Sequence, residues 1–165
     1  MLSHNTPDEH PKSATEYCIE DGLNLVLTYI KGPYLARVSG VSYSTISKIR
    51  NGYDRTPGKP YVCTEQIIDK LNAAIRSIAI DLADVHATEE NVMDLVLTYM
   101  PTIKFEPILV SSCGKSKSWF KHRSSKLSPQ YAHFSADDVD TMNRVFRIMS
   151  DMLFHVHILY VRAHT

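Results

Sequence analysis

The sequence has few of the residues that build disulfide-bonded, zinc-stabilised or membrane-spanning proteins. Its 165 residues include only three cysteines, Cys18, Cys63 and Cys113, which are far apart. An odd number without a Cys-x-x-Cys pair argues against a disulfide framework and a structural zinc site, and fits a reducing compartment. No run of ~18 apolar residues is present, so we expect no transmembrane helix. No basic-then-apolar stretch opens the chain, so we expect no secretory leader and a cytoplasmic location.

Catalytic groupings are lacking as well. The sequence shows no phosphate-cradling glycine loop, no Glu/His metal helix and no Ser/His/Asp grouping, so we expect neither an enzyme nor a cofactor. Three histidines near the carboxyl end, His155, His157 and His164, are the remaining candidate metal site. His155 and His157 would lie on different sides of a helix, where they chelate a metal poorly. We therefore expect no bound metal.

A net charge is also absent, because 18 Lys and Arg residues balance 18 Asp and Glu residues. This balance at first disfavours a nucleic-acid partner. The charges are nevertheless segregated along the chain: residues 1–22 and 81–94 are mostly acidic, whereas residues 31–60 and 104–126 are mostly basic. A phosphate backbone meets local surfaces rather than the net charge, so the two basic blocks are compatible with a nucleic-acid partner.

The most informative stretch covers residues 35–52 and predicts two short helices joined by a tight turn. Gly40 stands at the turn, where a left-handed backbone is needed that glycine enters freely. Ser42 is a natural N-cap for the second helix, and Ile46 with Ile49 gives that helix a buried edge. This spacing predicts a helix-turn-helix, in which the second helix is built to enter the DNA major groove.

The same stretch resembles the lambda-repressor/Cro-type helix-turn-helix family. The resemblance covers residues 15–80 and rests on Leu35-Ala36, Gly40-Val41-Ser42, Ile46-Ser47 and Asn51-Gly52. The sequence departs from the family at Gly32, where many members carry a glutamine that contacts the DNA backbone. The following Pro33 suits the first turn of a helix. The resemblance implies a double-stranded DNA partner and a transcriptional regulator, which we expect to be a repressor from a phage, a plasmid or a bacterium.

The outward side chains of the second helix are the expected DNA contacts. The resemblance implies that residues which follow the cap and point away from the buried edge reach base edges, where lysine donates to guanine and serine pairs with several bases. They are Tyr43, Ser44, Thr45, Ser47 and Lys48. The expected phosphate contacts, at the helix end and in the following loop, are Arg50, Asn51, Arg55 and Lys59; for Asn51 the resemblance implies this role, because it matches a position that commonly binds phosphate in the family. The plainer alternative is a solvated basic face that binds nothing.

The chain also repeats itself. The sequence Leu-Val-Leu-Thr-Tyr stands at residues 25–29 and again at residues 95–99, and residues 64–78 match residues 135–149. Two matching blocks in the same order, with the same alternation of charge, favour an internal duplication over chance.

The duplication predicts a second, divergent motif over residues 107–123. Either Gly114 is its turn glycine, or Cys113-Gly114 aligns with Val41-Ser42, so the register stays open at this point. Trp119 and Phe120 are expected to pack in the core rather than to stack on bases. The expected DNA face of this second copy is Lys115, Lys117, Lys121, His122 and Arg123.

We therefore expect an all-α fold of two tandem lambda-repressor-like helix-turn-helix bundles, residues 13–82 and 83–165, without strands. The expected helices cover residues 13–30, 33–39, 42–51, 65–82, 88–100 and 135–161, the first opened by Ser13 and Glu16 as a capping box. The last helix has more apolar residues than one small domain needs, so it packs either between the two copies or between two protomers. An alternative function follows: a DNA-tethered protein whose second half forms a homodimer or docks a protein partner through this helix.

Overall fold

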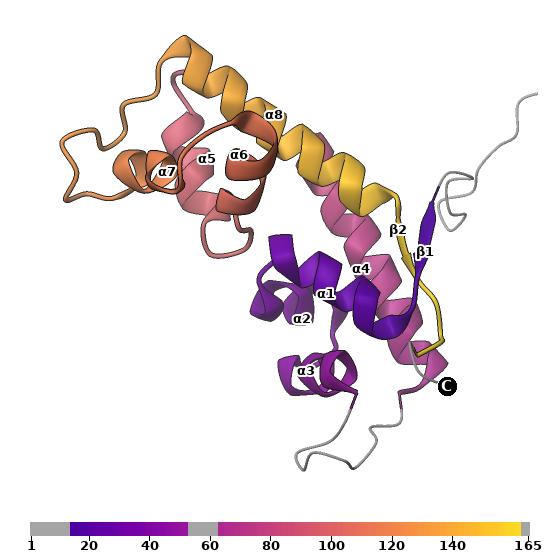
Figure 1. Cartoon of the computed structure of the whole chain (residues 1–165). Coiled ribbons are helices and arrows are strands. Elements are labelled where there is room, and N and C mark those ends of the chain that lie inside the picture. Colours follow the sequence, from indigo (N-terminus) through magenta and orange to yellow (C-terminus); the bar gives the residue numbers. More distant parts are fainter. Residues whose placement is uncertain (1–13, 53–62, 163–165) are drawn as a thin grey trace, which may run out of the picture.

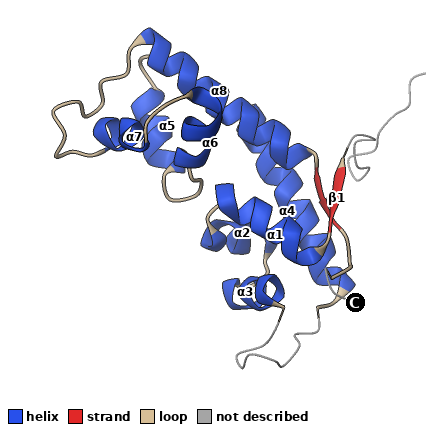
Figure 2. Ribbon diagram, in the orientation of Figure 1, coloured by secondary structure: helices blue, strands red, loops and turns tan. Residues whose placement is uncertain are grey.

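The computed structural model describes residues 14–52 and 63–162, and this part of the chain is mostly helical (Figure 1). The all-α expectation is confirmed at this level, with one short two-stranded parallel sheet in addition (Figure 2). The elements in chain order are β1 Thr15–Tyr17, α1 Ile19–Tyr29, α2 Gly32–Ser39, α3 Tyr43–Asn51, α4 Glu65–Ala83, α5 Val92–Tyr99, α6 Glu106–Cys113, α7 Lys117–Ser124, α8 Ala136–Phe154 and β2 Val156–Ile158.

The same order of helices occurs twice. Three short helices precede a long one in α1–α4 and again in α5–α8, and the long helices α4 and α8 pack against each other. Helix α2 packs on α4, and α6 packs on α8, so each group of short helices leans on its own long helix. Both groups lie on the same side of the α4–α8 pair (Figure 1).

The packed faces of α4 and α8 lie at the centre of the hydrophobic core. The apolar stripe expected for α4 is at most 2% exposed at Ile68, Leu71, Ile75 and Ile78, whereas Ile67 is only half-buried. The matching stripe of α8 is buried as well, at Val139, Met142, Phe146 and Met149. Burial of one such side chain stabilises the fold by ~1.5–3 kcal/mol. The apolar face of the last helix is thus used within this chain, between its two halves.

Each long helix carries an asparagine whose side chain hydrogen-bonds to the backbone of the segment that follows the other long helix. The Asn72 side chain on α4 accepts a hydrogen bond from the Ile158 N–H at 2.9 Å and donates one to the Ile158 carbonyl at 2.8 Å. The Asn143 side chain on α8 pairs in the same way with the Ala87 backbone, at 2.7 and 2.9 Å. Asn72 and Asn143 are equivalent positions of the sequence repeat, so the two halves exchange the same contact.

Two lysines make a second reciprocal pair of contacts. The Lys31 N–H donates to the Thr102 carbonyl at 2.9 Å, and the Lys104 N–H donates to the Tyr29 carbonyl at 2.7 Å. The ammonium of Lys31 reaches a backbone carbonyl at the end of α5, and that of Lys104 reaches one in the last turn of α1, at 2.6 and 2.8 Å. Each cation therefore meets the helix end where the dipole favours positive charge.

Two further contacts join a residue to its own counterpart. The Ser150 hydroxyl of α8 donates to the Ala79 carbonyl of α4 at 2.7 Å, and these residues are 71 positions apart. Ile30 and Ile103, which precede the two lysines, form an antiparallel bridge and are both buried. In a two-fold pair, residues near the axis contact their own equivalents, and other contacts come in reciprocal pairs. The two halves of this chain are thus related by an approximate two-fold axis.

The expectation that the chain has no strands is wrong. Residues 15–17, expected inside the first helix, form β1, which pairs in parallel with β2 of the other half. The Thr15 N–H donates to the His155 carbonyl at 2.7 Å, and the Leu159 N–H donates to the Tyr17 carbonyl at 2.8 Å. Helix α1 accordingly begins only at Ile19, and the proposed cap residue 13 lies outside the described residues. Strand pairing with a distant segment outweighs the local helix signal here.

Two helix bounds in the second half also differ from the expected ones. Helix α5 begins at Val92 rather than at residue 88, because Thr88 and Asn91 close a turn through two side-chain to backbone hydrogen bonds of 2.6 and 3.2 Å. Helix α8 ends at Phe154 rather than near residue 161, because the following residues join β1 as strand β2.

Candidate nucleic-acid interface

The turn between α2 and α3 has the geometry that the sequence predicts. Gly40 ends α2 with a left-handed backbone, φ 75° and ψ 7°, and its N–H donates to the Ala36 carbonyl. Ser42 is extended, and its hydroxyl oxygen accepts a hydrogen bond from the Thr45 N–H at 3.1 Å, which caps α3. Val41, between them, is buried and fills the corner. The turn glycine and the cap serine are therefore confirmed.

Helix α3 has one buried edge and one solvent-facing side. Ile46 and Ile49 are 0% exposed, as expected. The residues expected to contact bases lie away from these two: Tyr43 and Ser44 are exposed, and Thr45, Ser47 and Lys48 are partly exposed. The first turn of α3 is thus accessible to a ligand.

Gly32 and Tyr43 are in direct contact across the motif. A Cβ atom at Gly32 would overlap the aromatic ring of Tyr43, so only glycine leaves room for the ring at the start of α2. Gly32 is the position where the chain departs from the lambda-repressor/Cro pattern. The departure therefore has a local physical reason, because it lets the first residue of α3 pack on the first turn of α2.

The residues expected to contact phosphate at the carboxyl end of α3 differ in their surroundings. The Arg50 guanidinium donates to the Asn24 side chain at 2.7 Å, which ties α3 to α1. Asn51 is exposed, and Gly52 ends the helix with φ 78°. The remaining expected phosphate contacts, Arg55 and Lys59, lie outside the described residues.

The second half repeats the turn with the same spacing. Gly114 ends α6 with a left-handed φ of 65°, and extended Ser116 precedes α7, as Gly40 and Ser42 do between α2 and α3. The register that the sequence left open is thereby fixed, and Gly114 is the turn glycine. The cap is weaker, because the Ser116 side chain makes no hydrogen bond to the backbone of α7.

The aromatic residues of α7 face the protein. In this register Phe120 corresponds to Ile46, and its ring stacks on Phe105 with ring centroids 4.7 Å apart. Trp119 meets Phe134 edge to face at 6.3 Å. Both side chains are half-buried against the core, as the sequence analysis expected.

The cations of the second copy divide into two groups. Arg123 is held by the protein: its guanidinium lies 4.3 Å from the centre of the Trp119 ring, and its Nε lies 3.2 Å from the Asp138 carboxylate. Lys115 lies 5.2 Å from the same ring. The other expected DNA-face residues are exposed on α7 and are Lys117, Lys121 and His122. The outward positive charge of α7 thus comes from Lys117 and Lys121.

Asp138 belongs to the capping box that begins α8. It accepts a hydrogen bond from the Ser135 N–H, while the Ser135 hydroxyl accepts one from the Asp138 N–H. Burial raises the pKa of Asp138, but the Ser135 N–H and the Arg123 guanidinium outweigh it and hold this pKa below its usual value. A charged Asp138 therefore links α7 to the start of α8.

No family model, no curated protein and no solved structure matches this chain.

The structure adds no support for a metal site at the carboxyl-terminal histidines. His155 Nδ1 lies 2.7 Å from the Asp151 carbonyl, and His164 lies outside the described residues. Within residues 14–52 and 63–162, no three His, Cys, Asp or Glu side chains come together as a metal site would require. None of the helices in this part of the chain is both long and apolar enough to cross a membrane.

Proposed function

We propose that this protein is a sequence-specific double-stranded DNA-binding regulator that inserts α3 and α7 into major grooves. The observation that carries the proposal is the α2–turn–α3 unit with its left-handed Gly40, its capping Ser42 and its exposed first turn. A recognition helix needs a buried edge for its support and a free amino-terminal turn for the bases. The recurrence of the same unit as α6–turn–α7 supports two readers in one chain, that is, two tandem helix-turn-helix bundles.

The outward residues support different tasks for the two helices. On α3 the first turn offers the hydroxyls of Tyr43 and Ser44, which suit base edges, and Lys48 follows one turn later. On α7 the outward residues are mostly cationic, which suits phosphate contacts as well as guanine. The two half-sites on DNA are therefore expected to differ in sequence.

The two-fold relation supports a definite arrangement of these half-sites. Helices related by a two-fold axis meet DNA in opposite directions, so the half-sites would be inverted and about one helical turn, ~10 base pairs, or a multiple of it apart. Because Tyr43 and Lys117 hold equivalent positions, the operator would be an imperfect palindrome. A protein on such a site would repress transcription by blocking the access of polymerase to a promoter.

The proposal is tested by incubating the full chain with a library of random duplex DNA and sequencing the duplexes that it retains, at two salt concentrations. We expect an inverted two-part motif, with binding that weakens as salt rises because phosphate contacts release counterions. A single short motif would restrict base reading to one half of the chain. Absence of salt-sensitive duplex binding would refute the proposed function.

Paired lysine variants separate base reading from general charge. Lys48→Ala is expected to change the preferred bases in one half-site, and Lys121→Ala those in the other. Lys70, an exposed lysine of α4, provides the matched control, because Lys70→Ala removes the same charge outside both units. Equal losses on every DNA sequence for Lys48→Ala and Lys70→Ala would contradict base reading by α3.

A further inference from the structure

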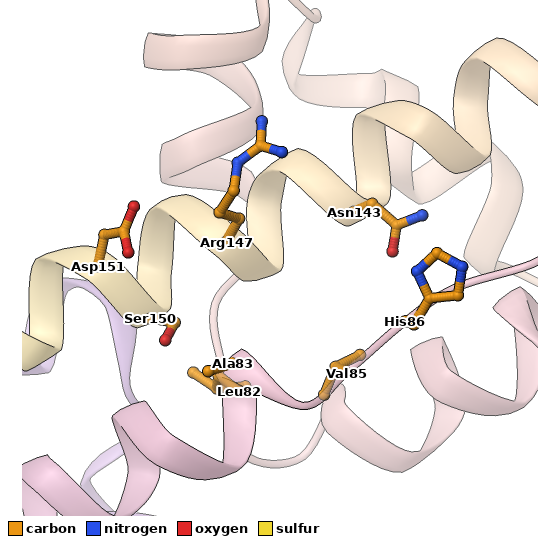
Figure 3. Close-up of a pocket in the computed structure, with 8 residues that line it drawn as sticks. All are labelled: Leu82, Ala83, Val85, His86, Asn143, Arg147, Ser150 and Asp151. Atoms are coloured by element: carbon orange, nitrogen blue, oxygen red, sulfur yellow. The ribbon is translucent and has the colours of Figure 1, made fainter.

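A surface pocket of about 330 Å³ lies between the carboxyl end of α4 and the middle of α8. Its apolar wall is made by Leu82, Ala83 and Val85 at the end of α4. Arg147 and Asp151 stand on α8 at the pocket, and the Arg147 guanidinium points away from this wall (Figure 3). The volume falls in the range in which proteins bind small organic molecules.

The polar groups at the other end of the pocket are already organised. Asn143 is fixed by its two hydrogen bonds to the Ala87 backbone. His86, the residue before Ala87, points toward Asn143 at this end of the pocket (Figure 3). Ser150 lies at the opposite end, beside Asp151 and Ala83, and is fixed by its bond to the Ala79 carbonyl (Figure 3). Both ends of the pocket are therefore held in shape by the same contacts that join the two halves.

The two-fold relation shows what fills the equivalent place in the other half. There the Arg76 guanidinium of α4 lies 5.6 Å from the centre of the Phe154 ring. Arg76 is equivalent to Arg147, and Phe154 is equivalent to Ala83, by the same separation of 71 residues that relates Ser150 to Ala79. In the half without the pocket, an aromatic ring, Phe154, thus lies under an arginine. In the half with the pocket, Ala83 offers only a methyl group at the equivalent position.

Arg147 has to turn about its side-chain torsions to lie over a ring at this wall, and its surroundings leave it free to do so (Figure 3). Its side chain is exposed, and within residues 14–52 and 63–162 the structure gives its guanidinium neither a hydrogen bond nor an ion pair. An arginine over the face of an aromatic ring is attracted by the ring quadrupole. The apolar wall would cover the other face of the ring and remove it from water.

We propose that this pocket binds a small molecule with an aromatic ring, which stacks under Arg147 in the place that corresponds to Phe154. The volume accommodates a ring system larger than one phenyl group, so a fused bicyclic ring of indole size suits it. The proposal needs no DNA, and its test is independent of the proposed function.

Titration of the ¹⁵N-labelled full chain with indole tests the site, with cyclohexanol as a non-aromatic control. We expect indole to shift the amide signals of Ala83, Val85 and His86 in a saturable way, and cyclohexanol to bind several-fold more weakly. Absence of saturable shifts at these residues would overturn the proposal, and so would equal binding of cyclohexanol.

Three variants give a sharper form of the same test. Ala83→Phe supplies the missing ring from the chain itself, so it should abolish indole binding while the protein stays folded. Arg147→Ala should weaken indole binding about 2- to 5-fold, the range expected for an exposed cation over a ring. Arg76→Ala is the matched control and should leave indole binding unchanged, because its own site is filled by Phe154. Undiminished binding by Ala83→Phe would refute the site.

Discussion

The reciprocal asparagine contacts lead to a quantitative prediction. Asn72→Ala removes two hydrogen bonds to Ile158, which is 1% exposed, and leaves both backbone groups of that residue without their partner. Each bond contributes ~1 kcal/mol, and an unsatisfied buried group adds to the loss, so we expect a cost of about 2–3 kcal/mol. If the halves are equivalent, Asn143→Ala should cost a similar amount through Ala87.

Thermal and urea unfolding of the full chain measure both losses. For a protein of this size, 1 kcal/mol corresponds to ~2–4 °C, so each variant should melt about 5–10 °C below the unmodified protein. Gln66→Ala, at an exposed position of the same helix α4, is the control and should change stability by less than ~0.5 kcal/mol. If only one of the two asparagine substitutions lowered the free energy of unfolding, or if both losses were as small as that of Gln66→Ala, the reciprocal asparagine contacts between the two halves would be refuted.

Three further predictions concern the turns and the caps. Gly40→Ala and Gly114→Ala should each cost ~1–2 kcal/mol in urea unfolding, because both residues have positive φ and open space around a new Cβ; a far larger loss would mean that a steric clash was overlooked. Because the folded pKa of Asp138 is lowered, its stabilising effect is present above the unfolded pKa of ~3.9 and is lost as pH falls below it. As the pH falls from ~4 to ~2, the Asp138→Asn variant should therefore lose less unfolding free energy than the unmodified protein. Equal losses in the two proteins would contradict the Arg123–Asp138 ion pair. Gly32→Ala should displace the Tyr43 ring and change DNA preference as Tyr43→Ala does, which enrichment of random duplex DNA can compare.

The parts of the fold that depend on local sequence could be predicted. The turn at Gly40, the cap at Ser42 and the buried edge of Ile46 and Ile49 all depend on residues within one or two helical turns. The bounds of α2, α3 and α4 differ from the expected bounds by no more than one residue. The exposed side of α3 followed from the same periodicity.

The parts that depend on distant pairing could not be predicted in this way. Residues 15–17 carry a helix signal, but they form β1 because their backbone pairs with β2 at the far end of the chain. The role of Asn72 was equally hidden, since its partner Ile158 is remote in sequence. One signal was available: Asn72 and Asn143 are identical polar residues at matching positions of the repeat, each directly after a buried apolar residue.

A pair of repeats within one chain can diverge in a way that a homodimer cannot. In a homodimer every substitution enters both subunits, so the axis and the two ligand-facing surfaces change together. Here three pairs of residues that join the halves are the same in both, and Ser150 against Ala79 is an exception. The identical pairs are Asn72 and Asn143, Lys31 and Lys104, Ile30 and Ile103. The outward positions of α3 and α7 differ, as Tyr43 against Lys117 and Ser47 against Lys121 do, and the pocket differs as Ala83 against Phe154. Such a distribution is expected when the axis is kept for stability while each half acquires its own ligand.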